Sequence, residues 1–255
     1  MLATLALTFL VASKPAPAMT AEMAAKLTIG AQQYGSTPGA EVQKASQNSR
    51  ALYLTPTDDI WVYAHAEDPQ KDPFLRAWGA NGKSVGIPGD DPNAFSYSLL
   101  KWDLSGFQSN SRLAEAQIVF TAAPEAGYTA QDAAAAPLEI RIVKGGFAES
   151  DWDYADAVKY TPAGDEGVVG MTSPTIVTDT EFKIVIDLMK GPADFRKMFE
   201  EAMKKGKVLN LAITSHIDPT SLGMKGVYKV YSKDATDPSV RPALRIVLDN
   251  PPKKK

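Results

Sequence analysis

The residues in this chain that could do chemistry are mainly carboxylates, which fall in clusters far apart in the sequence. The clusters are Asp58-Asp59, Asp90-Asp91, Glu149 with Asp151 and Asp153, and Asp165-Glu166. A glycoside hydrolase needs two carboxyl groups held about 5–10 Å apart across a sugar. Oxygen-rich loops also suit Ca²⁺, although no EF-hand spacing is present. Three interpretations therefore stay open: a solvated acidic surface, a catalytic pair, and a structural calcium site that uses Asp58, Asp59 and Asp249.

Several common catalytic arrangements are absent from the sequence. The two histidines, His65 and His216, lie far from any nucleophile elbow, and no His-x-x-x-His pair suggests a zinc protease. His216 follows an apolar run, so we expect a structural role at a strand end. Without cysteine the chain has no disulfides, thiolate metal sites or cysteine nucleophiles. The sequence therefore predicts a protein that is not an enzyme.

Aromatic side chains suggest binding, because a ring offers an apolar face on which a sugar can stack. Trp61 and Trp102 lie within strand-like patterns, so we expect them in the core. The other two tryptophans lie among polar residues in stretches that we expect to be loops. The sequence thus predicts a ligand-binding surface made of Trp78, Trp152, Tyr154, Glu149 and Asp151.

The elements that position these residues are mostly strands. Apolar and polar residues alternate in several short stretches, which are 138–143, 182–188, 209–213 and 244–248, and 60–63 is β-branched and aromatic. Alternation of this kind places one side of a strand on a core and leaves the other side more polar. Long loops are expected over 65–95, 121–137 and 148–180. The pattern predicts an all-β, antiparallel jelly-roll β-sandwich.

One amphipathic helix is expected to interrupt the strands. Gly191-Pro192 gives an entry with proline at the first helical position, and Gly206 can end the helix. Apolar residues follow at helical spacing, namely Phe195, Met198, Phe199, Ala202 and Met203. We expect this helix to pack over one end of the sandwich.

The N-terminal residues predict export of the protein, and the C-terminal residues predict a disordered tail. Leu2–Ala12 is apolar but too short to span a bilayer, and Ala16-Pro17-Ala18 fits a signal-peptidase site. No lysine or arginine precedes the apolar run, which is atypical of a signal. We divide the 255 residues into a signal peptide (1–18), a lead-in with a short helix (19–50), the sandwich (51–249) and a disordered basic tail (250–255). The expected location is secreted, periplasmic or cell-surface, without a transmembrane segment after cleavage.

Several stretches, taken in order, resemble the DNRLRE-domain family of secreted β-sandwich modules. Those stretches are Asp58 or Asp59 before Ile60-Trp61-Val62, the strand Leu99–Ser105, Ala114–Phe120, the loop Phe147–Trp152, Phe182–Leu188, Ser232-Lys233-Asp234, and Arg241–Val247. The family signature normally has arginine and glutamate where this chain has Lys233 and Asp234, and its first loop tryptophan is missing here. The resemblance implies a jelly roll that binds polysaccharide or builds cell-surface structures.

These observations together predict a secreted, non-catalytic protein that recognises an extracellular polysaccharide. The alternatives are a structural cell-surface protein with protein partners and, further away, a polysaccharide hydrolase or lyase. A net charge of −3 leaves no broad basic field for a nucleic acid. No cofactor is expected beyond the structural Ca²⁺ considered above.

Overall fold

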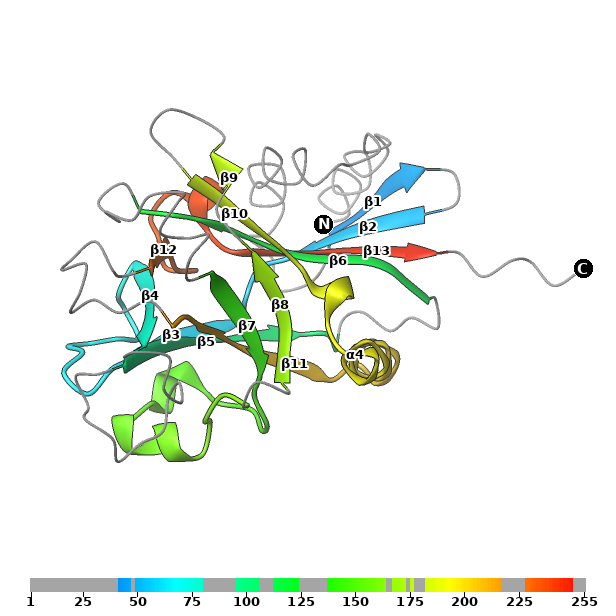
Figure 1. The fold of residues 1–255 in the computed structure, drawn as a ribbon. Helices are drawn as coiled ribbons and strands as arrows, with labels where there is room; N and C mark the ends of the chain where they lie inside the picture. The colour runs from blue at the N-terminus through cyan, green and yellow to red at the C-terminus, as the bar shows by residue number, and fades with distance from the viewer. Residues whose placement is uncertain are drawn as a thin grey trace, which may run out of the picture.

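Two antiparallel β-sheets lie one above the other in a computed structural model of the chain (Figure 1). The structure describes residues 41–46, 49–79, 95–105, 112–123, 137–163, 167–172, 175–176, 182–216 and 228–249. The expected signal peptide, the short helix near residue 21 and the basic tail lie outside these residues. Within them, the predicted antiparallel β-sandwich with one amphipathic helix is confirmed.

The first sheet has six strands, and every pairing in it is antiparallel. Its order is β1 (Glu41–Ser46), β2 (Ser49–Leu54), β13 (Ala243–Asp249), β6 (Arg112–Thr121), β10 (Phe182–Asp187) and β9 (Thr175–Ile176). The sheet extends into the segment treated above as a lead-in, because β1 pairs with β2 and lies wholly before residue 51.

The second sheet has seven strands. Its path runs through β12 (Tyr228–Tyr231), β4 (Phe74–Gly79), β5 (Phe95–Asp103), β11 (Val208–Thr214), β7 (Leu138–Ile142) and β8 (Val168–Thr172), while β3 (Asp58–Val62) also pairs with β5. Strands β4, β8 and β9 fall in stretches predicted to be loops, so that expectation is wrong. These strands are two to six residues long, and Gly170 interrupts β8, so they give little alternation for a sequence pattern to reveal.

The main core lies between the two sheets. Trp102 on β5 and Phe120 on β6 are fully buried there, together with Leu211, Ile246 and Leu100. The Trp102 indole nitrogen donates to the Leu54 carbonyl at 3.3 Å and so joins the second sheet to the first. The expected core position of Trp102 is confirmed, whereas Trp61 is only partly buried against this core.

A second apolar cluster lies on the outer side of the second sheet. Ile60 pairs with Leu99 and Val62 with Tyr97, so these four residues share one face. The segment from residue 143 to 160 covers them and contains two short 3₁₀ helices, η2 (Glu149–Asp151) and η3 (Tyr154–Val158). Figure 1 shows these helices beneath β3 and β5. We call residues 147–160 the covering segment.

Strand β12 brings the two sheets together at one end. Val230 forms an isolated bridge with Ala122 beside β6, and the Ala123 N–H donates to the Lys229 carbonyl at 2.8 Å. Short 3₁₀ helices complete the connections, with η5 at Leu188–Lys190 and η7 at Pro238–Val240. Both begin after an aspartate whose side chain accepts a backbone N–H, the usual way to satisfy a helix start.

The predicted helix is α4 (Ala193–Lys205), which lies at the opposite end of the sandwich from β4 and β12 (Figure 1). Phe195, Phe199, Ala202 and Met203 are buried as expected, while Met198 is exposed. Pro192 is the N-cap residue rather than the first helical residue. Gly206 ends the helix with φ 59° and ψ 46°, a left-handed conformation that glycine adopts without strain.

Helix α4 also contacts β6 near the place where the pairing of β6 with β13 is irregular. The register between β13 and β6 shifts between Val247 and Leu248. There the Glu200 carboxylate accepts the Leu113 N–H at 3.1 Å, and Arg196 donates to the Leu113 carbonyl. Two charged side chains thus satisfy the backbone N–H and carbonyl of Leu113 beside this shift.

We expect Glu200→Ala to lower the free energy of unfolding by about 1–2 kcal/mol, because the buried Leu113 N–H loses its acceptor. Urea denaturation followed by circular dichroism measures the change. Glu201→Ala is the matched control, since Glu201 is exposed and bonds only lysines of its own helix. An equal loss in both variants would show that ion pairs within the helix, rather than the contact with Leu113, account for the change.

Candidate functional site

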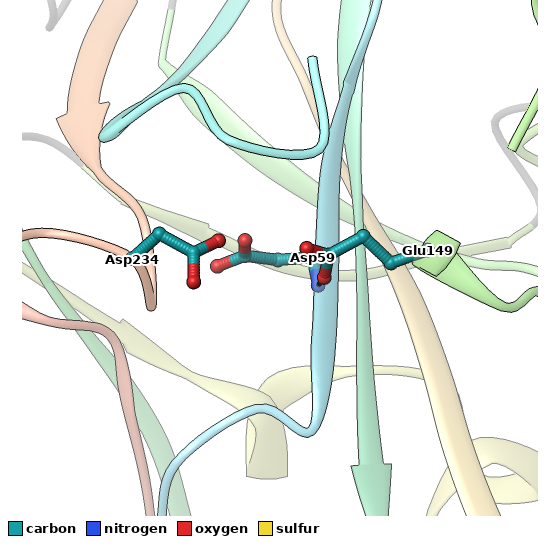
Figure 2. A group of neighbouring side chains, drawn as sticks. All are labelled: Asp59, Glu149 and Asp234. Atoms are coloured by element: carbon teal, nitrogen blue, oxygen red, sulfur yellow. Dashed lines mark hydrogen bonds between the residues drawn. The ribbon is translucent and has the colours of Figure 1, made fainter. Parts of the chain in front are cut away.

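Six charged residues from four separate parts of the chain meet beside β3, and we call them the charged junction. They are Asp58 and Asp59 on β3, Lys101 on β5, Glu149 at the start of η2, and Lys233 and Asp234 after β12. Figure 2 shows the Asp59, Glu149 and Asp234 carboxylates turned toward one another. Strand pairing and the β12 turn therefore bring together residues that are up to 176 positions apart, since 234 − 58 = 176.

One half of the charged junction fastens the covering segment to the sheet. The Lys101 ammonium lies 2.7 Å from an Asp58 carboxylate oxygen and donates to the Phe147 carbonyl, also at 2.7 Å. The other Asp58 oxygen accepts the Glu149 N–H at 3.2 Å. Asp58 and Lys101 are directly opposite in the β3–β5 ladder, which fixes this ion pair.

The other half fastens the turn after β12. The Lys233 N–H donates to Asp59 at 2.7 Å, and the Asp59 N–H donates to Glu149 at 3.0 Å. The Lys233 ammonium lies 3.0 Å from Glu149 and 2.8 Å from Asp234. Each backbone donor here ends on a carboxylate, so the arrangement is a connected network rather than a set of isolated surface pairs.

Burial and charge move the pKa values of the junction in different directions. Burial raises the pKa of Asp59 well above its ordinary value, against the opposing hydrogen bond and charge of Lys233. Burial also raises the pKa of Glu149. For Asp58, hydrogen bonds from Lys101 and from the Glu149 N–H outweigh burial and lower the pKa. Asp59 and Glu149 therefore favour protonation more than ordinary carboxyl groups do.

The junction has the grouped carboxylates of a metal site, but an ammonium group already lies among them. One oxygen each of Asp59, Glu149 and Asp234 lies within 4.8 Å of the other two. The Lys233 ammonium already bonds two of these groups, so the position a cation would take is served by a side chain. Among the described residues, the predicted calcium set is not brought together, because the exposed Asp249 lies on β13 and Asp58 bonds Lys101.

The predicted ligand-binding residues lie in two different places. Trp78 is on β4 and Trp152 is in the covering segment, and each is only 8 % exposed. Trp152 packs against Phe147 and Tyr160, which leaves little of its ring for a sugar. Tyr154 is partly exposed, and Asp151 is exposed. The fifth predicted residue, Glu149, belongs to the charged junction.

Half-buried aromatic rings instead gather around β4 and β12, on what we call the aromatic–cation face. It consists of Trp61, Tyr63, Phe74, Arg76, Lys229 and Tyr231. Trp61 stacks on Tyr63 with centroids 5.3 Å apart, and the Arg76 guanidinium lies 4.1 Å from the Trp61 ring centroid. The Lys229 ammonium lies 4.1 Å from the Phe74 centroid. Contacts of this kind hold both rings and cations in fixed positions.

A buried ionic network lies on β7 and β11. Arg141 donates twice to one Glu139 oxygen, at 3.1 and 2.6 Å, and once to the Thr214 hydroxyl at 3.0 Å. The His216 ring nitrogen Nε2 lies 3.3 Å from Arg141 and 3.6 Å from Glu139. This position agrees with a structural role for His216 at a strand end.

Sequence reasoning did not name Lys233, Asp234 or Arg76 as site residues. Lys233 and Asp234 follow a short strand and carry no metal-ligand spacing, although they belong to the stretch that resembles the DNRLRE signature. Arg76 lies in a strand that was expected to be a loop. The sequence feature that could have identified Arg76 is a charged residue placed between aromatic residues, as in Phe74-Leu75-Arg76-Ala77-Trp78.

None of the helices among the described residues is both long and apolar enough to cross a membrane. Comparison with known protein families and with curated proteins found no match to this chain.

Proposed function

We propose that this chain is a secreted, non-catalytic β-sandwich protein that binds an extracellular polysaccharide through the aromatic–cation face. The observation that carries the proposal is the set of half-buried rings held in place by ring–ring and cation–ring contacts. Tyrosine and tryptophan rings combine an apolar body with a polar group, which suits the alternating apolar and hydroxyl surfaces of sugars. Rings already fixed in position lose little conformational entropy when a ligand binds.

Polar groups beside the rings supply hydrogen bonds and orientation. Arg76 is held by Asp72, whose carboxylate lies 2.5 Å from the guanidinium, and its side chain stays 20 % exposed. Lys229 pairs with Arg76 across the β4–β12 ladder, so the two cations lie side by side. A few well-placed polar groups among aromatic ones are typical of small-ligand sites. A shallow face of this kind suits a polymer, because many sugar units add avidity.

The resemblance to the DNRLRE-domain family supports the same proposal. Stretches that carry the resemblance supply every residue of the charged junction: the opening aspartates, Lys101, Glu149, and Lys233-Asp234. If the chain shares the fold of that family, the stretches that resemble its signature should lie close together, and here they meet in one bonded network. In this view the junction positions the β3 and β12 strands on which Trp61 and Tyr231 lie.

The carboxylates favour a structural role over a catalytic one. Glu149 would be the natural acid or base of a polysaccharide hydrolase or lyase, yet it accepts hydrogen bonds from Lys233 and from the Asp59 backbone. Asp151, the nearby candidate partner, is exposed and lies outside this network. A catalytic carboxyl group must reach the substrate, and these contacts direct Glu149 toward the fold.

We expect Tyr231→Ala and Tyr63→Ala each to weaken polysaccharide binding by roughly tenfold, the effect of losing about 1.4 kcal/mol of binding free energy. Affinity electrophoresis against a panel of neutral and acidic polysaccharides, with and without Ca²⁺, measures the change. Melting curves on each variant separate lost binding from lost folding. The matched comparison is Tyr154→Ala, which removes a partly exposed tyrosine from the covering segment.

Each outcome has a clear meaning. Loss of binding in Tyr154→Ala but not in Tyr231→Ala would move the site to the covering segment. Absence of binding across the panel, with self-association of the folded protein, would favour a structural cell-surface protein. The same face supports that second function, because tryptophan, tyrosine and arginine are the residues most enriched at the energetic centres of protein interfaces.

A further inference from the structure

The charged junction joins the covering segment to the rest of the fold through few contacts, and most of them involve ionisable groups. Glu149 reaches the sheet through its backbone N–H to Asp58 and through its carboxylate to the Asp59 N–H and Lys233. At the Trp152 end, Gln70 donates to the Trp152 carbonyl at 3.1 Å. The first turn, η2, buries no side chain of its own and is held mainly by these charged contacts, whereas Phe147, Trp152 and Ala157 hold the rest of the covering segment by apolar packing.

The charges at this point do not balance. The junction contains four carboxylates and two ammonium groups, so complete ionisation leaves an excess of 4 − 2 = 2 negative charges. Asp59 faces Lys233, Glu149 and Asp234, while Asp58 faces Lys101. Asp59 is 2 % exposed, so water screens its charge poorly.

From this geometry we propose that the charged junction is a pH-sensitive latch, which holds the covering segment on β3 more tightly in mildly acidic than in alkaline solution. Asp59 lies within β3 and pairs with Leu100 in the β3–β5 ladder, so it stays in place when the network is strained. Glu149 lies at the start of a 3₁₀ helix and regains water when its turn lifts. Opening of the latch at Glu149 exposes Trp152, which that turn now helps to bury.

The direction of the effect follows from proton linkage. The pKa values of Asp59 and Glu149 are raised by burial in the closed state, so the closed state binds more protons than the open one. The closed state is therefore favoured at low pH. This preference is lost as the pH rises through the raised pKa values of Asp59 and Glu149. Asp58 acts in the opposite direction: because its pKa is lowered in the closed state, its contribution to closure is complete above the ordinary aspartate value of about 4 and is lost as pH falls below that value. The latch is therefore tightest at pH values above the ordinary aspartate pKa and below the raised pKa values of Asp59 and Glu149.

Hydrogen–deuterium exchange on the whole chain tests the proposal. After correction for the intrinsic exchange rate, protection of peptides spanning 147–160 should fall as pH rises from about 5 to about 8, by up to about tenfold per pH unit for each proton released. Asp59→Asn should weaken this dependence and keep the segment better protected at the higher pH, because asparagine still accepts the Lys233 N–H without carrying a charge, while Glu149 continues to titrate. Glu149→Gln should behave in the same way and serves if the first variant does not fold.

Asp156→Asn is the matched control, since it removes a carboxylate from the same segment that pairs only with the exposed Lys159. This variant should keep the pH dependence of the unmodified protein. Protection of 147–160 that stays level or rises with pH in the unmodified protein would overturn the proposal. So would an unchanged pH dependence in both Asp59→Asn and Glu149→Gln. Neither result depends on which ligand the protein binds.

Discussion

Trp102→Ala is expected to destabilise the protein by about 3–5 kcal/mol, the usual cost of removing a buried aromatic side chain. The indole is completely buried between the two sheets. Its removal leaves a cavity and also leaves the Leu54 carbonyl without the donor that joins the sheets. In a chain of this size about 1 kcal/mol shifts the melting temperature by roughly 2–4 °C, so a fall of roughly 6–20 °C is expected.

Thermal denaturation followed by circular dichroism measures this effect, and Trp102→Phe separates its two causes. Phenylalanine fills much of the cavity but donates no hydrogen bond, so most of the stability should return. Val158→Ala removes apolar atoms from a side chain that is 66 % exposed and should leave the melting temperature unchanged. A Trp102→Ala melting temperature close to that of the unmodified protein would mean that the sandwich does not pack around this residue.

The main features of the fold could be predicted because they rest on periodicity. Strands β5, β6, β10, β11 and β13 have alternating or strongly apolar patterns, and α4 has a clear helical stripe with a terminal glycine. Strand β4 could not be predicted in this way. Its residues Phe74-Leu75-Arg76-Ala77-Trp78 place large side chains on both faces, since the strand passes between the core and the aromatic–cation face.

The candidate site was predictable only in part, because proximity depends on which strands pair. Asp58, Asp59 and Glu149 were singled out as carboxylates, but nothing in the sequence shows that Lys101 lies opposite Asp58 or that Lys233 bonds Glu149. Trp152 was expected at the surface because its neighbours are polar. Those neighbours form short 3₁₀ helices that turn the indole inward onto Phe147.

Burial of the polar face of β7 is the clearest departure from the sequence pattern. Glu139 and Arg141 alternate with Leu138 and Ile140, which predicts that they face water. They are instead 6 % and 3 % exposed. Arg141 donates to the Ala163 carbonyl at 3.1 Å as well as to Glu139 and Thr214, so polar partners of the fold rather than water satisfy its side chain. Alternation reports the polarity of a face, but it does not report whether another segment covers that face.

This burial leads to the second large expected effect. We expect Arg141→Met to lower the free energy of unfolding by about 3–5 kcal/mol, because removal of one partner leaves the buried Glu139 charge uncompensated. The Thr214 hydroxyl, which donates to Glu139 at 3.3 Å, cannot replace two guanidinium contacts. Urea denaturation near neutral pH measures the loss.

The double variant Glu139→Gln with Arg141→Met distinguishes a charge effect from a packing effect. Glutamine keeps an acceptor for the Thr214 hydroxyl and carries no charge, so the double variant should be more stable than Arg141→Met alone. The exposed pair Asp156–Lys159 gives a control, and Lys159→Met should leave the denaturation midpoint unchanged. If the double variant is instead less stable than Arg141→Met, the guanidinium serves mainly to fill space and to bond Ala163. The uncompensated charge of Glu139 would then not be the cause of the stability lost in Arg141→Met.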